Sequence, residues 1–177
     1  FSIDDSQTTE IDDALSLQGL GSGTVTIGIH IAAPGLAVQP GSPVDGLGRA
    51  RLSTVYMPGY KVTMLPDDVV QTYTLQEGRD CPSVSLYVML DEATLEIKSS
   101  ETRLERVPIA HNLRHDQLDA VVTEQWLTDT AFEHKNDSQP SSALREQLSF
   151  LYRLAKDLKA KREVVRGKPE TFNRPDY

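Results

Sequence analysis

The chain contains little cysteine and no long apolar run, and each shortage excludes a class of structure. Its single cysteine, Cys81, rules out an internal disulfide and a metal site made from several cysteines. No stretch is apolar for long enough to cross a bilayer, so we expect no membrane partner. The 177 residues suffice for one domain with a buried core. The sequence therefore indicates a soluble globular protein, and its cysteine content fits a reducing, cytoplasmic setting.

Positive charge is also missing, because no lysine or arginine occurs in the first 48 residues. The same segment carries five acids close together, at Asp4, Asp5, Glu10, Asp12 and Asp13. Carboxylates that are held close together repel one another, so some of them must take up a proton or bind a cation. Ligand sets made only of oxygen atoms suit hard divalent cations such as Mg²⁺ and Mn²⁺. The segment therefore predicts metal-assisted chemistry on a phosphate.

Two plainer interpretations of the acidic segment remain open from these residues alone. The first is a solvated loop, which is how clusters of Asp and Glu often occur. The second is a calcium-stabilised module, which selective binding of Ca²⁺ over Mg²⁺ and Mn²⁺ would identify. The acids lack the spacing, the glycine and the flanking helices of an EF-hand loop, so that type of calcium site does not fit.

Charge is unevenly distributed along the rest of the chain. The formal net charge is −8, which argues against a freestanding nucleic-acid binder. Between Arg145 and Lys168, however, eight bases occur with three acids. We interpret this basic stretch as the solvated face of a helix, with a separate binding role as the alternative.

Alternating β-branched residues predict strands in the first two thirds of the chain. Residues 23–33 alternate with period two, and residues 13–18 are a plausible partner in a hairpin. A second clear strand covers residues 83–90, and residues 94–106 form an exposed arm beside it. Residues 34–48 are rich in proline and glycine, so we expect a loop or short turns there.

Further along the chain the pattern becomes helical. Apolar residues share one face over residues 116–127, and leucines recur at helical spacing over residues 144–158. Ser141 or Ser142 is the expected N-cap of the second helix, and Gly167 is expected to end it. Strands followed by helices predict an α+β fold, with an antiparallel or mixed sheet from the N-terminal half and packed helices from the C-terminal half.

Three further side chains are expected to be structural. His30 on its strand fits a hydrogen-bonded core histidine, and Cys81 fits a passive core or loop residue. Trp126 is expected to pack against the leucines of the second helix.

The acidic segment resembles a known motif. The pattern Ile-Asp-Asp-x-x-Thr-x-Glu-Ile-Asp-Asp-Ala-Leu-Ser, residues 3–16, is similar to the signature loop of the RNB domain. This is the catalytic domain of ribonuclease II, ribonuclease R and the hydrolytic exosome subunit. Residues 28–32, 40–45, 53–58 and 64–66 resemble, in order, further motifs of that family. Several motifs in register are far more specific than one acidic run.

The resemblance implies a metal site and contacts to RNA. The family's metal ligands carry over onto Asp4, Glu10, Asp12 and Asp13, with Mg²⁺ or Mn²⁺ as the implied cofactor. The second of these positions is more usually Asp in the family, so Glu10 is a departure that would alter rate or metal preference. Residues that contact the RNA bases carry over onto Tyr56 and His115.

The implied function is hydrolysis of single-stranded RNA from the 3′ end, releasing nucleoside 5′-monophosphates. Residues 1–177 are expected to form the N-terminal portion of a single RNB catalytic domain. The resemblance places the catalytic arginine in the remainder of that domain, which is absent here together with the flanking OB-type RNA-binding domains. This portion is therefore expected to be weakly active or inactive, with the missing half of the polypeptide as its partner. The alternative is a catalytically inactive RNB-like module that binds RNA or protein.

Overall fold

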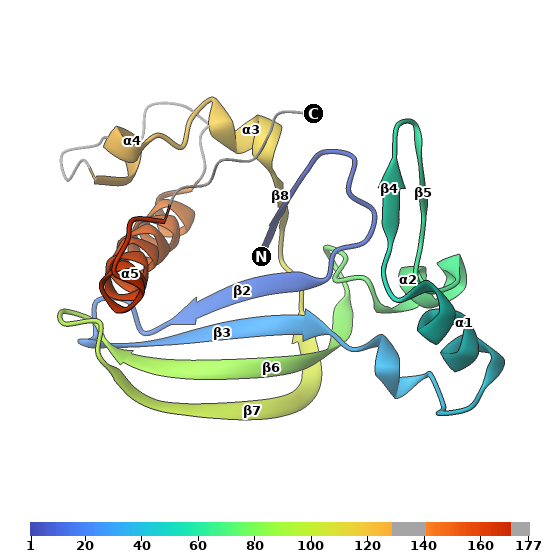
Figure 1. Ribbon diagram of the computed structural model, residues 1–177. Coiled ribbons are helices and arrows are strands. Elements are labelled where there is room, and N and C mark those ends of the chain that lie inside the picture. Colours follow the sequence, from blue (N-terminus) through green and yellow to red (C-terminus); the bar gives the residue numbers. More distant parts are fainter. Residues whose placement is uncertain (129–140, 171–177) are drawn as a thin grey trace.

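A four-stranded antiparallel sheet forms the centre of the fold in the computed structural model, which describes residues 1–128 and 141–170 (Figure 1). Its strands, in spatial order, are β2 (Asp13–Gln18), β3 (Thr24–Ala32), β6 (Asp80–Asp91) and β7 (Ile97–Pro108). The expected hairpin of β2 and β3 is confirmed, as are the strand over residues 83–90 and the largely exposed arm that follows it. The α+β class is likewise confirmed.

One face of the sheet packs against the long helix α5 (Ser142–Arg166). Val25 and Ile27 of β3 and Leu90 of β6 form a buried cluster with Phe150 of this helix. The predicted N-cap is confirmed, because the Ser141 side chain accepts a hydrogen bond from the Leu144 N–H. The helix ends at Gly167, whose backbone is left-handed as that position favours.

The opposite face carries a buried polar group at the middle of the sheet. His30 is 1% exposed, and its two ring nitrogens lie 2.8 Å from Ser16 Oγ and 2.8 Å from Ser85 Oγ. Burial lowers the pKa of His30, so the ring stays neutral while both of its nitrogens are hydrogen-bonded. The expectation of a structural histidine is confirmed. Gly28 leaves room for this arrangement.

The segment between β3 and β6 is more ordered than its composition predicts. It contains η1 (Pro34–Leu36), α1 (Pro43–Arg51), β4 (Val55–Met57), β5 (Tyr60–Val62) and α2 (Asp67–Tyr73). The expectation of only loop and short turns over residues 34–48 was wrong for its second half, where α1 begins. Ser42 caps that helix by accepting from the Asp45 N–H, and Pro43 occupies the first turn, where a missing N–H costs nothing.

A second departure concerns the predicted helix over residues 116–127. Two short helices, α3 (His115–Asp119) and α4 (Glu124–Thr128), replace it, because Val121, Val122 and Thr123 interrupt the helix between them. β-Branched side chains lose freedom in a helix, and Thr123 instead accepts a hydrogen bond from the Trp126 N–H at the start of α4. Most of the polar loop expected over residues 136–142 lies outside the described residues.

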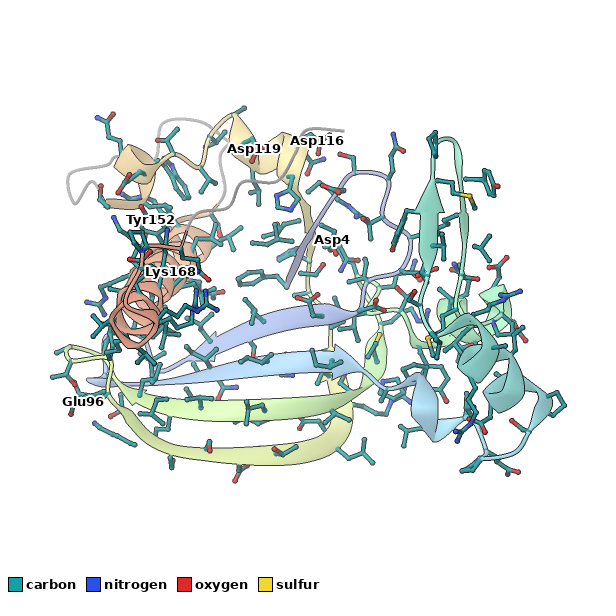
Figure 2. The ribbon with its side chains drawn as sticks, in the orientation of Figure 1. Asp4, Glu96, Asp116, Asp119, Tyr152 and Lys168 are labelled. Carbon is teal, nitrogen blue, oxygen red and sulfur yellow. The ribbon has the colours of Figure 1, made fainter. Side chains whose placement is uncertain are left out.

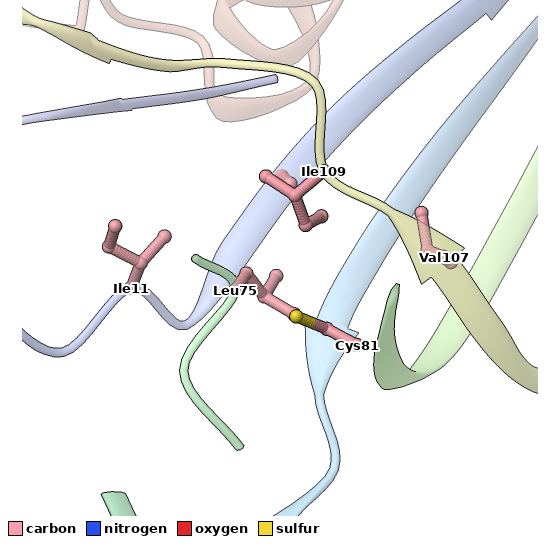
Figure 3. Close-up of a cluster of buried hydrophobic side chains, with 6 residues drawn as sticks. Ile11, Leu75, Cys81, Val107 and Ile109 are labelled. Carbon is pink, nitrogen blue, oxygen red and sulfur yellow. The ribbon is translucent and has the colours of Figure 1, made fainter. Parts of the chain in front are cut away.

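A small strand pair and a second core cluster join the start of the chain to the segment that follows β7. β1 (Ser2–Asp4) pairs in parallel with β8 (Asn112–Arg114), although the two are far apart in the chain. The core cluster beneath them includes Ile11 and Cys81, which is fully buried as expected (Figure 3). Its other members are Ala14, Leu75, Val107 and Ile109.

The basic stretch between Arg145 and Lys168 behaves as the surface of α5. Five of its bases form ion pairs, namely Lys156, Lys159, Lys161, Arg162 and Arg166. Tyr152 and Lys168 lie on this side of the molecule, well apart from Asp4 (Figure 2). Trp126 is buried and lies against Arg145 of α5. Within the described residues, no helix has the length and hydrophobicity needed to cross a membrane.

We predict that Gly28→Ala lowers the free energy of unfolding. A Cβ atom there would clash with Ser16 Oγ and lie 2.7 Å from the His30 ring, and two hydrogen bonds hold that ring in place. The expected loss is about 1–3 kcal/mol, measured by chemical denaturation. Gly46→Ala in α1 is the control, because open space surrounds that position. An equal loss in both variants would contradict the prediction.

Candidate active site

The acidic segment leaves β1 at Asp4 and rejoins the sheet at Asp13, and a buried isoleucine anchors it between them. Ile11 is 4% exposed and packs in the core cluster of Figure 3. Its N–H donates to Thr74 Oγ1 at 2.8 Å, and its carbonyl accepts from the Leu75 N–H at 2.9 Å. Because Ile11 points into the core, its neighbours Glu10 and Asp12 project away from it.

The other end of the segment is held through its backbone. Arg114, at the end of β8, donates from Nη1 to the carbonyl of Asp5 at 2.9 Å and to that of Thr8 at 3.3 Å. Thr8 N–H also donates to the Asp5 carbonyl, which closes a turn. The Asp4 carboxylate accepts a hydrogen bond from Ser2 Oγ at 2.5 Å. The loop therefore keeps its shape while four carboxylates project from it.

Glu10 is tied to the hairpin of β4 and β5. Its Oε1 lies 3.1 Å from Lys61 Nζ in an ion pair, without hydrogen-bond geometry, and its Oε2 accepts from Thr54 Oγ1 at 3.2 Å. Lys61 also donates to Thr9 Oγ1 at 3.0 Å. The Glu10 side chain is 9% exposed, so this ion pair is largely shielded from water. Figure 1 shows the acidic loop between this hairpin and β8.

A cleft of about 510 Å³ opens beside the acidic loop. Glu10 and Asp12 line it together with Tyr56 of β4 and Tyr73 of α2. Tyr56 is 72% exposed, so its ring presents a large face to solvent. The cleft therefore combines carboxylates with an aromatic ring that is available for stacking.

Three of the carboxylates act electrostatically on the fourth, Asp12. The pKa of Asp12 is raised, first by loss of solvent around the carboxyl group and then by repulsion from Glu10 and Asp13, with a smaller contribution from Asp4. The Lys61 charge acts in the opposite direction and lowers it. Asp12 thus lies at the electrostatic centre of the acidic segment.

The donor set fits a hard divalent cation in its chemistry, because all four side chains are carboxylates. Glu10 Oε1 is moreover buried and accepts no hydrogen bond. Among residues 1–128 and 141–170, however, no group of three or more His, Cys, Asp or Glu side chains already surrounds a single point. Binding of one metal ion by these carboxylates therefore requires their side chains to reorient. Glu10 is the most constrained of them, because its two oxygens already interact with Lys61 and Thr54.

The structure brings some of the predicted site residues together and leaves others apart. Glu10, Asp12 and Tyr56 share the cleft, whereas Asp4 and Asp13 interact with Asp12 only electrostatically. His115 is exposed at the start of α3 and does not line the cleft.

Sequence reasoning missed Lys61, Thr54 and Arg114. These residues lie far from the acidic loop along the chain. No local pattern marks Lys61 or Arg114, and the motif at residues 53–58 includes Thr54 without indicating that it binds Glu10. The only signal was the need for a cation that the first 48 residues lack.

A larger cavity, of about 780 Å³, lies beside α5. Arg153 and Lys156 line it with Phe150 and Tyr152, and it contains none of the predicted site residues. Arg153 and Lys156 already contact the Phe150 and Tyr152 rings, respectively. Of the two, only the smaller cleft is lined by predicted site residues, namely Glu10, Asp12 and Tyr56.

Comparison with known proteins gives consistent matches. The model of the RNB domain matches residues 1–172. Chloroplastic/mitochondrial ribonuclease II of Arabidopsis thaliana is 37% identical over 91 residues, which cover 51% of this chain. Yeast Ssd1, described as a pseudonuclease, superposes with a TM-score of 0.71 at 26% identity over 99% of the chain. RNase R of Mycoplasma genitalium, solved with double-stranded RNA, gives a TM-score of 0.71 at 19% identity over 91% of the chain.

The chain spans only a small part of each of these proteins. It covers 11% of the Arabidopsis ribonuclease, 19% of the Ssd1 chain and 27% of the RNase R chain.

We predict that Asp12→Asn stabilises the metal-free protein at neutral pH. An acid whose folded pKa lies above its unfolded value costs stability when ionised, and stability rises as pH falls through that raised pKa. The variant removes this cost, so its advantage should be a few tenths of a kcal/mol to about 1 kcal/mol, limited by solvent screening at an exposed residue.

The measurement is thermal unfolding with chelator, at neutral pH and at acidic pH where native Asp12 is protonated. The advantage should shrink toward acidic pH. Asp5→Asn, an exposed acid of the same loop, is the control. A variant that is destabilised at neutral pH would contradict the predicted repulsion.

Proposed function

Because the chain belongs to the RNB-domain family, we propose that it forms part of a metal-dependent hydrolytic exoribonuclease. The proposed substrate is single-stranded RNA, degraded from its 3′ end to nucleoside 5′-monophosphates. The observation that carries the proposal is the acidic loop, in which all four motif positions are carboxylates and two of them line a cleft with an exposed tyrosine. Relatives with the same domain are named as ribonucleases.

The proposed metal ligands are Asp4, Glu10, Asp12 and Asp13, with Mg²⁺ or Mn²⁺ as the cofactor. Divalent ions bound there would activate a water and stabilise the leaving oxygen of a phosphodiester. The carboxylates themselves repel an anionic substrate, so cation binding is also what allows RNA to approach them.

Tyr56 is proposed to hold a base of the RNA by stacking, since every base has an aromatic face. Its position beside Glu10 and Asp12 would place the sugar–phosphate backbone of a stacked nucleotide next to the acids. His115 remains a predicted second contact, which is able to stack but lies outside this cleft.

We further propose that residues 1–177 are the N-terminal portion of a larger RNB catalytic domain. The small share of each relative that the chain covers supports this. The remainder of the polypeptide would supply the arginine that faces the reacting phosphate and the rest of the RNA channel. A cytoplasmic location remains a prediction, since relatives include an organellar protein.

A second candidate function is that of a catalytically inactive module that binds RNA or protein. Two observations favour it. Glu10 forms an ion pair with Lys61, and the similar yeast protein Ssd1 is described as a pseudonuclease. The two functions differ in one measurable respect, because an inactive module would bind RNA without shortening it.

We predict that Asp12→Asn abolishes RNA digestion, with a loss of at least about a thousandfold in rate, because Asp12 lies at the centre of the charge that the metal must neutralise. The assay is digestion of 5′-labelled single-stranded RNA by the full-length protein with Mg²⁺ or Mn²⁺, and Asp5→Asn is the control. A ladder that shortens from the 3′ end with the native protein alone is expected. RNA that is bound yet stays intact with the native protein would establish the inactive module instead.

We predict that Tyr56→Ala weakens binding of single-stranded RNA by roughly 5- to 150-fold, the effect of losing one stacked base. Tyr60→Ala is a matched control, because Tyr60 is a 63% exposed tyrosine of the same hairpin that does not line the cleft. Fluorescence anisotropy with a labelled, non-hydrolysable RNA analogue in the presence of Mg²⁺ measures binding without turnover. Equal effects of the two substitutions would show that Tyr56 has no special role.

A further inference from the structure

Sites that cleave phosphodiesters often hold two divalent cations. We propose that here the ammonium group of Lys61 takes the place of one of them. This narrows the ligand set proposed above from four carboxylates to three. A single metal ion would bind on Asp4, Asp12 and Asp13, while Glu10 stays paired with Lys61. The inference rests on the proposed function for the existence of the metal site. It concerns how many cations the site holds and which residues hold them.

The first support is the geometry of the ion pair. Lys61 Nζ lies 3.1 Å from Glu10 Oε1, and the two side chains are only 29% and 9% exposed. A shielded pair of this kind is costly to separate, because either partner alone would leave an uncompensated charge with little water around it. A metal ion that used Glu10 would have to displace Lys61 first.

The second support is that neighbouring groups fix both partners in this arrangement. The Thr54 hydroxyl accepts from the Met64 N–H at 3.2 Å, so its own proton is free to point at Glu10 Oε2, also at 3.2 Å. On the other partner, Lys61 Nζ donates to Thr9 Oγ1 at 3.0 Å. Both oxygens of Glu10 are thus engaged by the hairpin segment and not by the other acids.

The third support is charge. Lys61 carries the positive charge that acts on the Glu10–Asp12 end of the acidic loop. An ammonium group offers three donors and one unit of charge, which suits a carboxylate pair as a fixed cation although it cannot polarise a bound water as a divalent ion does. The Glu10 carboxylate is the acid of the loop that reaches Lys61 of β5.

The test is a count of bound Mn²⁺ ions in the full-length protein, by titration calorimetry and by the electron paramagnetic resonance signal of free Mn²⁺. We expect the native protein to bind one ion and Lys61→Met to bind two, since the substitution keeps the side-chain length while freeing Glu10. Lys98→Met is the matched control, because Lys98 forms an ion pair with Asp91 at 3.0 Å away from the acidic loop. It should bind one ion, as the native protein does.

Glu10→Gln provides an independent reading if Lys61→Met does not fold. Under the proposal it retains the single ion with an affinity within about threefold of native, a difference below 1 kcal/mol, whereas Asp12→Asn loses the ion. Two ions in the native protein, loss of an ion in Glu10→Gln, or no ion in the native protein would each overturn the proposal. The ion count does not depend on RNA digestion, so a protein that binds one ion but leaves RNA intact would refute the proposed activity separately.

Discussion

Repulsion among carboxylates is the constraint on which this structure depends. Four acids on one short loop repel one another, and within the part of the chain that the structure describes Lys61 is the one cation paired with any of them, through Glu10. Much of what holds the loop in shape is therefore packing and backbone hydrogen bonding. Ile11 buries its side chain in the core, and its backbone bonds to the segment that follows α2. The sheet then fixes the chain on one side of the acids and the β1–β8 pair fixes it on the other. The cost of crowding the carboxylates is thus offset by packing and backbone hydrogen bonds.

Many of the strands and helices were predictable from the sequence, because the patterns that indicate them are local. Alternation along β3 and β6, the leucine spacing of α5 and its serine cap each report on a few neighbouring residues. The helix α1 was missed because its proline and glycine content resembles that of a loop, although its serine cap and first-turn proline are also local signals. The split between α3 and α4 shows the reverse case, in which apolar spacing suggested one helix but a β-branched run broke it.

The candidate site was predictable only in part. The acids and Tyr56 follow from motifs that lie in register along the chain, and the structure places Glu10, Asp12 and Tyr56 at one cleft. Partners such as Lys61 and Thr54 are set by how the β4–β5 hairpin folds against the loop, which is a property of tertiary structure. The chain is similar both to ribonucleases and to a pseudonuclease. One fold can account for both similarities, because it positions the acidic loop whether or not chemistry occurs there.

Arg114 holds the acidic loop by its carbonyl oxygens and not by its side chains. Every residue type except proline offers the chain the same backbone groups, and the carbonyl is common to all. Substitution of the side chains of residues 5–9 during evolution would therefore leave both hydrogen bonds from Arg114 in place. A loop held by its backbone can therefore change the charge or length of these side chains by single substitutions, while Arg114 keeps the loop in position.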